Sequence, residues 1–238
     1  MKRKQVSKIL LGLTTTPGSD WREKVSEIDR FGIKEVALFP TYLKPEERQI
    51  LYQILEKTSL ESIAFVHLRQ DFDVKEVDYL ANRYKVKLFN IHPDIEGIKG
   101  LKKIEKYRDQ IYLENLENNM DDIASNLDKC AGICIDFSHW EAAKRDSARR
   151  DYSKFVSLIN KKKIKFCHIS GILDAPRDFP WDPSKLPTHS WHYMEDVKNL
   201  NYIKNYTEYL PEILGLELEN SFEEQLKAKE YLEKLISK

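Results

Sequence analysis

The segment AGICIDFSHW, residues 131–140, joins an apolar run to two side chains that can bind metal ions. Its first half, from Ala131 to Ile135, is small, apolar and partly β-branched, which is typical of a strand covered on both faces. Asp136 and His139 follow where such a strand would end. The segment therefore predicts a buried strand with a carboxylate and an imidazole at its carboxyl end.

Similar apolar runs recur along the chain, separated by longer segments rich in Lys and Glu. The eight runs cover residues 8–14, 35–39, 62–67, 86–92, 110–114, 131–136, 164–168 and 213–219. Amphipathic helices are expected between them, for example over 20–32, 44–57 and 221–236. Eight strand–helix units predict an α/β fold, a single (β/α)8 TIM barrel over residues 1–238. The chain carries neither the glycine-rich fingerprint of a dinucleotide site nor a P-loop.

The composition limits the classes of partner. The chain has 39 basic and 39 acidic residues, so its net charge of zero gives no global attraction to nucleic acid or to an acidic membrane. Three cysteines without the spacing of a disulfide framework indicate reduced thiols. The apolar stretch near the N-terminus is too short for a membrane span or a signal peptide. We expect a cytoplasmic protein, and the sequence indicates no membrane and no obligate protein partner.

The carboxyl ends of barrel strands face the site that such folds use for chemistry. Histidines or carboxylates end six consecutive predicted strands, and the long segment after the seventh, residues 170–197, adds two more histidines. These residues include all six histidines of the chain: His67, His92, Glu114, Asp136 with His139 just beyond it, His168, Glu219, and His189 and His192 in the long segment. Glu217 and Glu219 alternate, so both could point inward, and Glu219 is preferred only because it is nearer the open end.

Each of these residues alone also fits a structural role. A histidine at a strand end is often hydrogen-bonded within the fold, and a glutamate there often lies beside a helix start. Together, however, they would form a buried polar cluster at one rim of the barrel, which is costly unless compensated. A divalent cation removes that cost, because imidazole and carboxylate both bind zinc, manganese or iron. The sequence therefore predicts a metal site, with zinc or manganese as the expected cofactor.

Six short motifs resemble those of the xylose-isomerase-like TIM-barrel superfamily, and within it the endonuclease IV (AP endonuclease family 2) type. The motifs are VALFP (36–40), NIHP (90–93), LEN (113–115), CIDFSH (134–139), FCHIS (166–170) and LELEN (216–220). The resemblance covers the whole chain in pattern and is specific in these motifs, above all in the Asp-x-x-His of the sixth strand.

The resemblance implies two or three metal ions per chain. It assigns the first to His67, His92 and Glu114, and the second to Glu114 as a bridge with Asp136, His168 and Glu219. A third would use His139 and His189, but Pro187 stands where the family has an aspartate, so that Asp182 or His192 would have to substitute.

Three functions follow from this set. The favoured one is metal-dependent hydrolysis of a phosphodiester or phosphomonoester, with Glu114, Glu219 and His139 as catalytic residues. The alternative is a sugar isomerase or epimerase of the same superfamily, which needs one ion and a carboxylate base. The resemblance favours the phosphoesterase, because a first site containing His67 and His92 is usually absent from the epimerases. A barrel that binds metal or another ligand without turnover is the third candidate.

Several residues near the predicted site are candidates for substrate binding. Arg69 could contact a phosphate or form a surface ion pair, and the tryptophans could stack on a sugar or base or anchor the loops. The candidates are Arg69, Trp140, Trp181, Trp191 and His192. The expected partner is a small phosphorylated or sugar substrate, or abasic DNA.

Overall fold

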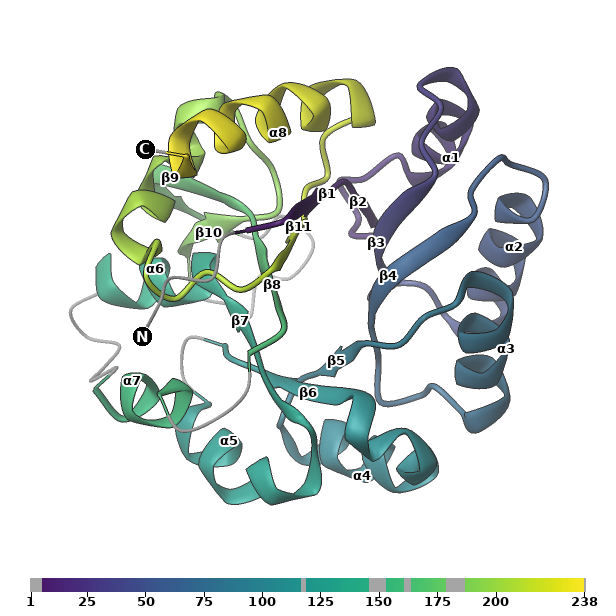
Figure 1. The fold of residues 1–238 in the computed structure, drawn as a ribbon, viewed down its shortest axis with the longest axis horizontal. Helices are drawn as coiled ribbons and strands as arrows, with labels where there is room; N and C mark the ends of the chain where they lie inside the picture. The colour runs from purple at the N-terminus through teal and green to yellow at the C-terminus, as the bar shows by residue number, and fades with distance from the viewer. Residues whose placement is uncertain (1–5, 117–118, 146–152, 161–163, 179–186, 238) are drawn as a thin grey trace.

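The computed structural model describes residues 6–116, 119–145, 153–160, 164–178 and 187–237. Its strands form a ring with helices around the outside (Figure 1). Neighbouring strands of the ring are parallel, in the order β1-β11-β8-β7-β6-β5-β4-β3-β2. Within the described residues they are β1 (Lys8–Leu10), β2 (Gly12–Thr14), β3 (Glu35–Phe39), β4 (Ser62–His67), β5 (Phe89–Ile91), β6 (Ile111–Glu114), β7 (Gly132–Asp136), β8 (Phe166–Ile169) and β11 (Ile213–Leu216). This parallel ring confirms the predicted TIM barrel.

The first predicted strand is divided into two short strands. β1 pairs with β11 and β2 pairs with β3, so the two halves of one segment close the ring. A β-carbon on Gly12 would lie 1.6 Å from the Leu216 carbonyl oxygen, so only glycine permits this approach. The Gln225 side chain accepts from the Gly12 amide at 2.7 Å and donates to the Gly12 carbonyl at 3.0 Å. These bonds satisfy backbone groups at the point where the strand changes partner.

Helices cover the outer face of the ring (Figure 1). Asp20, Asp73, Asp94 and Ser221 each accept a bond from the amide three residues ahead, which satisfies donors at a helix start. The α-helices are α1 (Trp21–Arg30), α2 (Pro45–Leu55), α3 (Val74–Tyr84), α4 (Ile95–Lys103), α5 (Met120–Asn126), α6 (Phe137–Arg145), α7 (Ser153–Ile159) and α8 (Phe222–Ile236). The 3-10 helices are η1 (Glu105–Gln110), η2 (Leu127–Lys129) and η3 (Val197–Tyr206).

The long segment after β8 is more ordered than the irregular loop that the sequence predicts. Its described parts form an antiparallel pair, β9 (Gly171–Arg177) and β10 (Thr188–Trp191). Trp181 and Asp182 lie outside the described residues. The pair brings residues near 190 back against the start of β9, since Trp191 lies opposite Gly171.

The barrel has an outer core under the helices and a smaller inner core inside the ring. The inner core consists of Leu10, Ala37, Phe39, Phe65, Leu88, Tyr112, Cys134 and Phe166. All three cysteines belong to the described residues and are free thiols, and Cys134 and Cys167 are buried. Among the described helices, none is long and apolar enough to cross a membrane.

Candidate metal centre

A buried polar layer lies directly above the inner core. Side chains alternate along a strand, so the residue two positions beyond an inward-facing one also points into the barrel. In five segments of the ring, a polar side chain follows two positions after an inner-core residue. In the sixth, the polar side chain follows two positions after Gly215, which lies beside Phe65. This polar layer consists of His67, Asn90, Glu114, Asp136, His168 and Glu217, which are all buried.

His168 is surrounded by the three carboxylates of the polar layer. Its Nε2 lies 3.3 Å from Glu114 Oε2, and its Nδ1 lies 3.4 Å from Asp136 Oδ2 and 2.7 Å from Glu217 Oε2. The His168 imidazole packs on the inner core, with its centroid 5.4 Å from that of the Phe39 ring. Three strands and the segment after β11 thus bring one imidazole and three acids together in the buried interior.

Glu114 also faces a second pair of imidazoles. Its Oε2 lies 3.4 Å from His67 Nδ1, and its Oε1 lies 3.4 Å from His92 Nε2. The His67 and His92 rings are perpendicular neighbours with centroids 4.8 Å apart. His92 follows β5 one layer further out than Asn90, which explains why it is half-buried rather than buried. The first predicted ligand set therefore lies together around one carboxylate.

The two carboxylate oxygens of Asp136 have different surroundings, one at the start of α6 and the other beside two imidazoles. Its Oδ1 accepts from the backbone amides of Ser138 at 2.7 Å and His139 at 3.0 Å, at the start of α6. Its Oδ2 remains in the centre, 3.4 Å from His168 Nδ1 and 3.5 Å from His139 Nε2. The helix bonds hold the carboxylate so that one oxygen stays available for a ligand.

The residues of this centre fit a divalent cation. Asp136 Oδ2, His67 Nδ1 and both ring nitrogens of His168 are buried and have no hydrogen-bond partner of acceptable geometry. Such atoms are costly unless another group satisfies them. Among the described residues, three sets place one ligand atom each within 4.8 Å of the others: His67, His92 and Glu114; His67, His168 and Glu217; and Glu114, Asp136 and His139. Imidazole nitrogen with carboxylate oxygen is a donor set that suits zinc or manganese.

The electrostatics of the cluster keep Glu114 and Glu217 ionised. Burial alone would raise the pKa of Glu114, but the nearby imidazoles of His67, His168 and His92 hold that pKa well below its usual range. The pKa of Glu217 is lowered to about 2, because His192 and His168 outweigh its burial. Burial lowers the pKa of His67 to about 4, so this imidazole is neutral and can offer a nitrogen lone pair near neutral pH.

Burial also disfavours the charged form of His168, yet the neighbouring Glu114 raises its pKa well above the ordinary value. Three carboxylates close to one imidazole therefore attract a positive charge, which either a proton on His168 or a bound cation can supply.

The structure places Glu217, rather than Glu219, in the polar layer. β11 ends at Leu216, and the alternation that would turn both glutamates inward ends with it. The Leu218 carbonyl then accepts bonds from Thr14 Oγ1 at 2.8 Å and Lys24 Nζ at 2.5 Å, which draws the chain toward β2 and α1. The Glu219 carboxylate lies against Gly18, where a β-carbon would be 2.2 Å from its Oε2. No ligand set formed by the described residues includes Glu219.

The two histidines of β10 and its following turn differ in position. His192 Nε2 lies 3.7 Å from Glu217 Oε1, at the edge of the polar layer. His189 Nδ1 lies 2.9 Å from the Leu173 carbonyl of β9, and no ligand set of the described residues includes His189. Among the described residues, no ligand set contains both His139 and His189, as the third predicted site requires.

The substrate-binding candidates also separate. Trp140 is buried among aromatic rings, with its centroid 6.0 Å from Phe137, 5.2 Å from Phe155 and 4.8 Å from Tyr206. It therefore packs in the outer core instead of facing a substrate, because a large ring on the first turn of α6 is covered by η3. Trp191 is 9% exposed.

Arg69 lines a cavity of about 270 Å³ beside the first ligand set, which His67 and His92 also line. Its Nη1 donates to the Thr41 carbonyl at 2.6 Å and its Nε donates to Asp71 Oδ1 at 3.3 Å. Two anchors thus fix the guanidinium next to the candidate metal ligands.

Solved structures that are similar to this one come from several classes of protein. A xylose isomerase domain protein from Planctomyces limnophilus matches with a TM-score of 0.51 at 10% identity, over 100% of this chain and 99% of that chain. A truncated 3-deoxy-D-arabino-heptulosonate 7-phosphate synthase from Thermotoga maritima matches with a TM-score of 0.53 at 13% identity, over 97% and 86%. An AP endonuclease of family 2 from Brucella melitensis matches with a TM-score of 0.47 at 11% identity, over 92% and 96%.

No protein-family model and no curated protein matches the sequence. At the identities of the solved structures, the likeness shows the fold alone. That fold is the α/β TIM barrel that the sequence predicts.

Proposed function

We propose that this chain is a divalent-metal-dependent phosphoesterase whose two ions share Glu114. The supporting observation is the division of that carboxylate, with Oε1 toward His92 and Oε2 toward His67 and His168. His67 and His92 would hold one ion with Glu114, and Asp136, His168 and Glu217 would hold the other. When bound, two such cations lower the pKa of water and neutralise negative charge on a phosphoryl group.

The surrounding residues would orient the substrate. Arg69 is fixed beside the cavity and would donate to a phosphoryl oxygen, for which a planar guanidinium is well shaped. His139 extends from the first turn of α6 toward Asp136 and would carry a proton to the departing oxygen.

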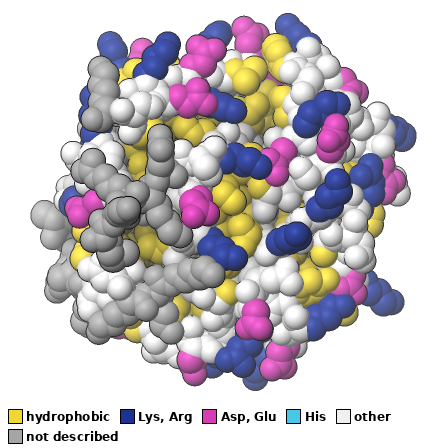
Figure 2. All heavy atoms as spheres, in the orientation of Figure 1, with side chains coloured by type: hydrophobic (Ala, Val, Ile, Leu, Met, Phe, Trp, Pro, Cys, Tyr) yellow, Lys and Arg dark blue, Asp and Glu magenta, His cyan; other side chains and the backbone are white. Residues whose placement is uncertain are grey.

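A small phosphorylated substrate fits this site better than abasic DNA. The cavity of about 270 Å³ is below the range of roughly 300–1,000 Å³ that holds drug-sized ligands. Over the whole chain 39 basic residues balance 39 acidic ones, and on the face drawn in Figure 2 the two kinds of side chain are intermixed. Mixed charge of this kind gives little attraction to a DNA backbone. The expected substrate is therefore a phosphomonoester or phosphodiester of a small sugar or nucleotide.

One observation favours the alternative, a metal-dependent sugar isomerase or epimerase. Glu114, Asp136 and Glu217 surround His168, so three carboxylates that could serve one ion lie together without His92. One ion could hold two neighbouring sugar oxygens, and a carboxylate such as Glu217 would then move a proton at carbon.

The His92→Ala variant separates the two functions. Because His92 belongs only to the first ligand set, we expect the variant to lose phosphoester cleavage by on the order of 100-fold or more, whereas an isomerase would stay active. Wild type, His92→Ala and a surface control, Lys227→Ala, are assayed on a nitrophenyl phosphomonoester, a phosphodiester, abasic DNA and a panel of ketoses. Wild-type-like cleavage by His92→Ala would contradict the two-ion proposal. A folded wild type that binds metal and turns over none of these substrates would favour the non-catalytic barrel.

A further inference from the structure

A second cavity lies away from the polar layer, on the outside of the ring at the opposite end of β6. Its volume is about 370 Å³, and it is bordered by α4, η1, η2 and the first residue of β6. Ile111 begins β6 and Glu114 ends it, three residues or about 10 Å further along the strand. The cavity is therefore separate from the candidate metal centre.

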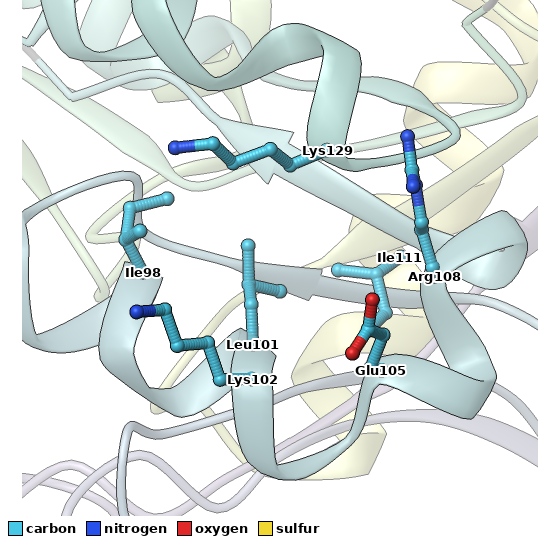
Figure 3. Close-up of a pocket in the computed structure, with 7 residues that line it drawn as sticks. All are labelled: Ile98, Leu101, Lys102, Glu105, Arg108, Ile111 and Lys129. Atoms are coloured by element: carbon cyan, nitrogen blue, oxygen red, sulfur yellow. The ribbon is translucent and has the colours of Figure 1, made fainter.

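The floor of this cavity is apolar. Leu101 projects into its middle from α4, with Ile98 on one side and Ile111 behind it (Figure 3). Leu101 and Ile111 are buried in the rest of the fold, and Ile98 is half-buried. A hydrocarbon group placed against these side chains would itself leave water, which is favourable.

The rim of the cavity is cationic. Lys102, Arg108 and Lys129 come from three different segments and stand around the apolar floor, with Glu105 as the acid among the lining residues (Figure 3). Two of these cations are held in place, because Arg108 donates to the Asp128 carbonyl and Lys129 Nζ donates to Asn126 Oδ1 at 2.8 Å. Three positive charges and one negative charge leave a net positive rim above the floor.

We propose that this cavity binds a small amphipathic carboxylate, with its hydrocarbon part on the Ile98–Leu101–Ile111 floor and its carboxylate at the cationic rim. A purely apolar ligand would leave the rim unused, and an inorganic anion would leave the floor uncovered. The guanidinium of Arg108 can donate to a carboxylate through its fork, and Lys102 and Lys129 add charge at the same edge.

The proposal predicts a dependence on chain length. Each methylene group buried on the floor should raise affinity about fourfold. This gain should stop once the hydrocarbon fills the cavity, and longer chains should bind no better. A matching alcohol, which lacks the charge, should bind at least about tenfold more weakly than the carboxylate.

Calorimetric titration of the full chain tests the proposal. The probes are straight-chain carboxylates from butanoate to dodecanoate, the corresponding 1-alkanols, and inorganic phosphate. We expect one carboxylate per chain. Binding should weaken about tenfold or more in Arg108→Gln and should disappear in Leu101→Trp, where the larger ring fills the cavity. The surface control Lys57→Gln should bind as wild type does.

Each other outcome would overturn the proposal. Equal binding of alcohols would mean a simple apolar groove, and binding of phosphate as tight as the best carboxylate would mean a polar anion site. Unchanged binding in Leu101→Trp would place the ligand elsewhere, including at the candidate metal centre. The thermal unfolding temperature of each variant without ligand shows whether a loss of binding reflects a loss of fold.

Discussion

Asn90 holds the orientation of Glu114, because its Nδ2 donates to Glu114 Oε2 at 2.5 Å inside the barrel. Both side chains are buried, and their strands are neighbours in the ring. Asn90 therefore acts on the centre through the carboxylate that both proposed ions share, and we regard it as a positioning residue.

Replacing Asn90 with Ala should weaken metal binding about 10- to 100-fold, which is the usual effect of removing a partner that orients a ligand. The loss arises because Glu114 can then rotate, so that its two oxygens no longer face His92 and His67 together. Calorimetric titration with Zn²⁺ and Mn²⁺ measures the affinity. Asn126→Ala on the surface is the matched control. Wild-type affinity in a folded Asn90→Ala protein would show that Glu114 needs no such support.

The two glutamates after β11 should differ in their effect on metal binding. We expect Glu217→Gln to lower the affinity for the second ion on the order of 100-fold or more, since it removes a charged oxygen next to His168. Glu219→Gln should leave that affinity within about threefold, a difference of less than 1 kcal/mol, because its carboxylate lies against Gly18.

The pair of isosteric variants serves as its own control, because both substitutions keep the side-chain shape and remove one charge. Metal content and affinity are measured for each. The opposite ranking, with Glu219→Gln the weaker binder, would return Glu219 to the centre and would contradict the placement of Glu217.

Lys24 should make stability depend on pH above neutrality. Burial lowers the pKa of Lys24 to about 7 in the folded protein, against the attraction of Glu219 and Glu27. In the unfolded chain this pKa is about 10.4. Between pH 7 and 10 the unfolded state therefore binds a proton that the folded state lacks, and the free energy of unfolding rises with pH. The contribution is at most about 1.4 kcal/mol per pH unit.

Urea denaturation of wild type and Lys24→Met at several values between pH 7 and 9 measures this dependence. Other titrating groups act in both proteins, so only the difference in slope reports on Lys24. The wild-type free energy of unfolding should rise more steeply with pH than that of the variant. Parallel slopes would mean that Lys24 stays protonated in the folded chain.

The sequence predicts most of the strands because burial on both faces leaves a readable apolar run. The runs at 35–39 and 62–67 coincide with β3 and β4. The division of the first run at Leu11 was not predictable, because it depends on a change of pairing partner from β11 to β3. The antiparallel pair after β8 was not predicted either, because β9 is buried only over its first three residues and leaves no long apolar run.

The sequence predicts the inward direction of candidate ligands that belong to a strand. It does not predict the direction of side chains that follow the end of a strand. His67, Glu114 and Asp136 end their strands in the structure and point into the barrel. Glu217 and Asn90 were not chosen from the sequence, although counting two residues from the inward-facing Gly215 and Leu88 would have found both. The position of Trp140 could not be derived, because the aromatic residues around it come from distant segments.

The metal content of the purified full chain tests the central claim most directly. Protein dialysed against Zn²⁺ or Mn²⁺ and then freed of excess metal is analysed by elemental mass spectrometry, next to the His92→Ala variant. The shared position of Glu114 predicts two ions per chain for wild type and one for the variant. A folded wild type that retains no ion, or a variant that retains as many ions as wild type, would contradict the account.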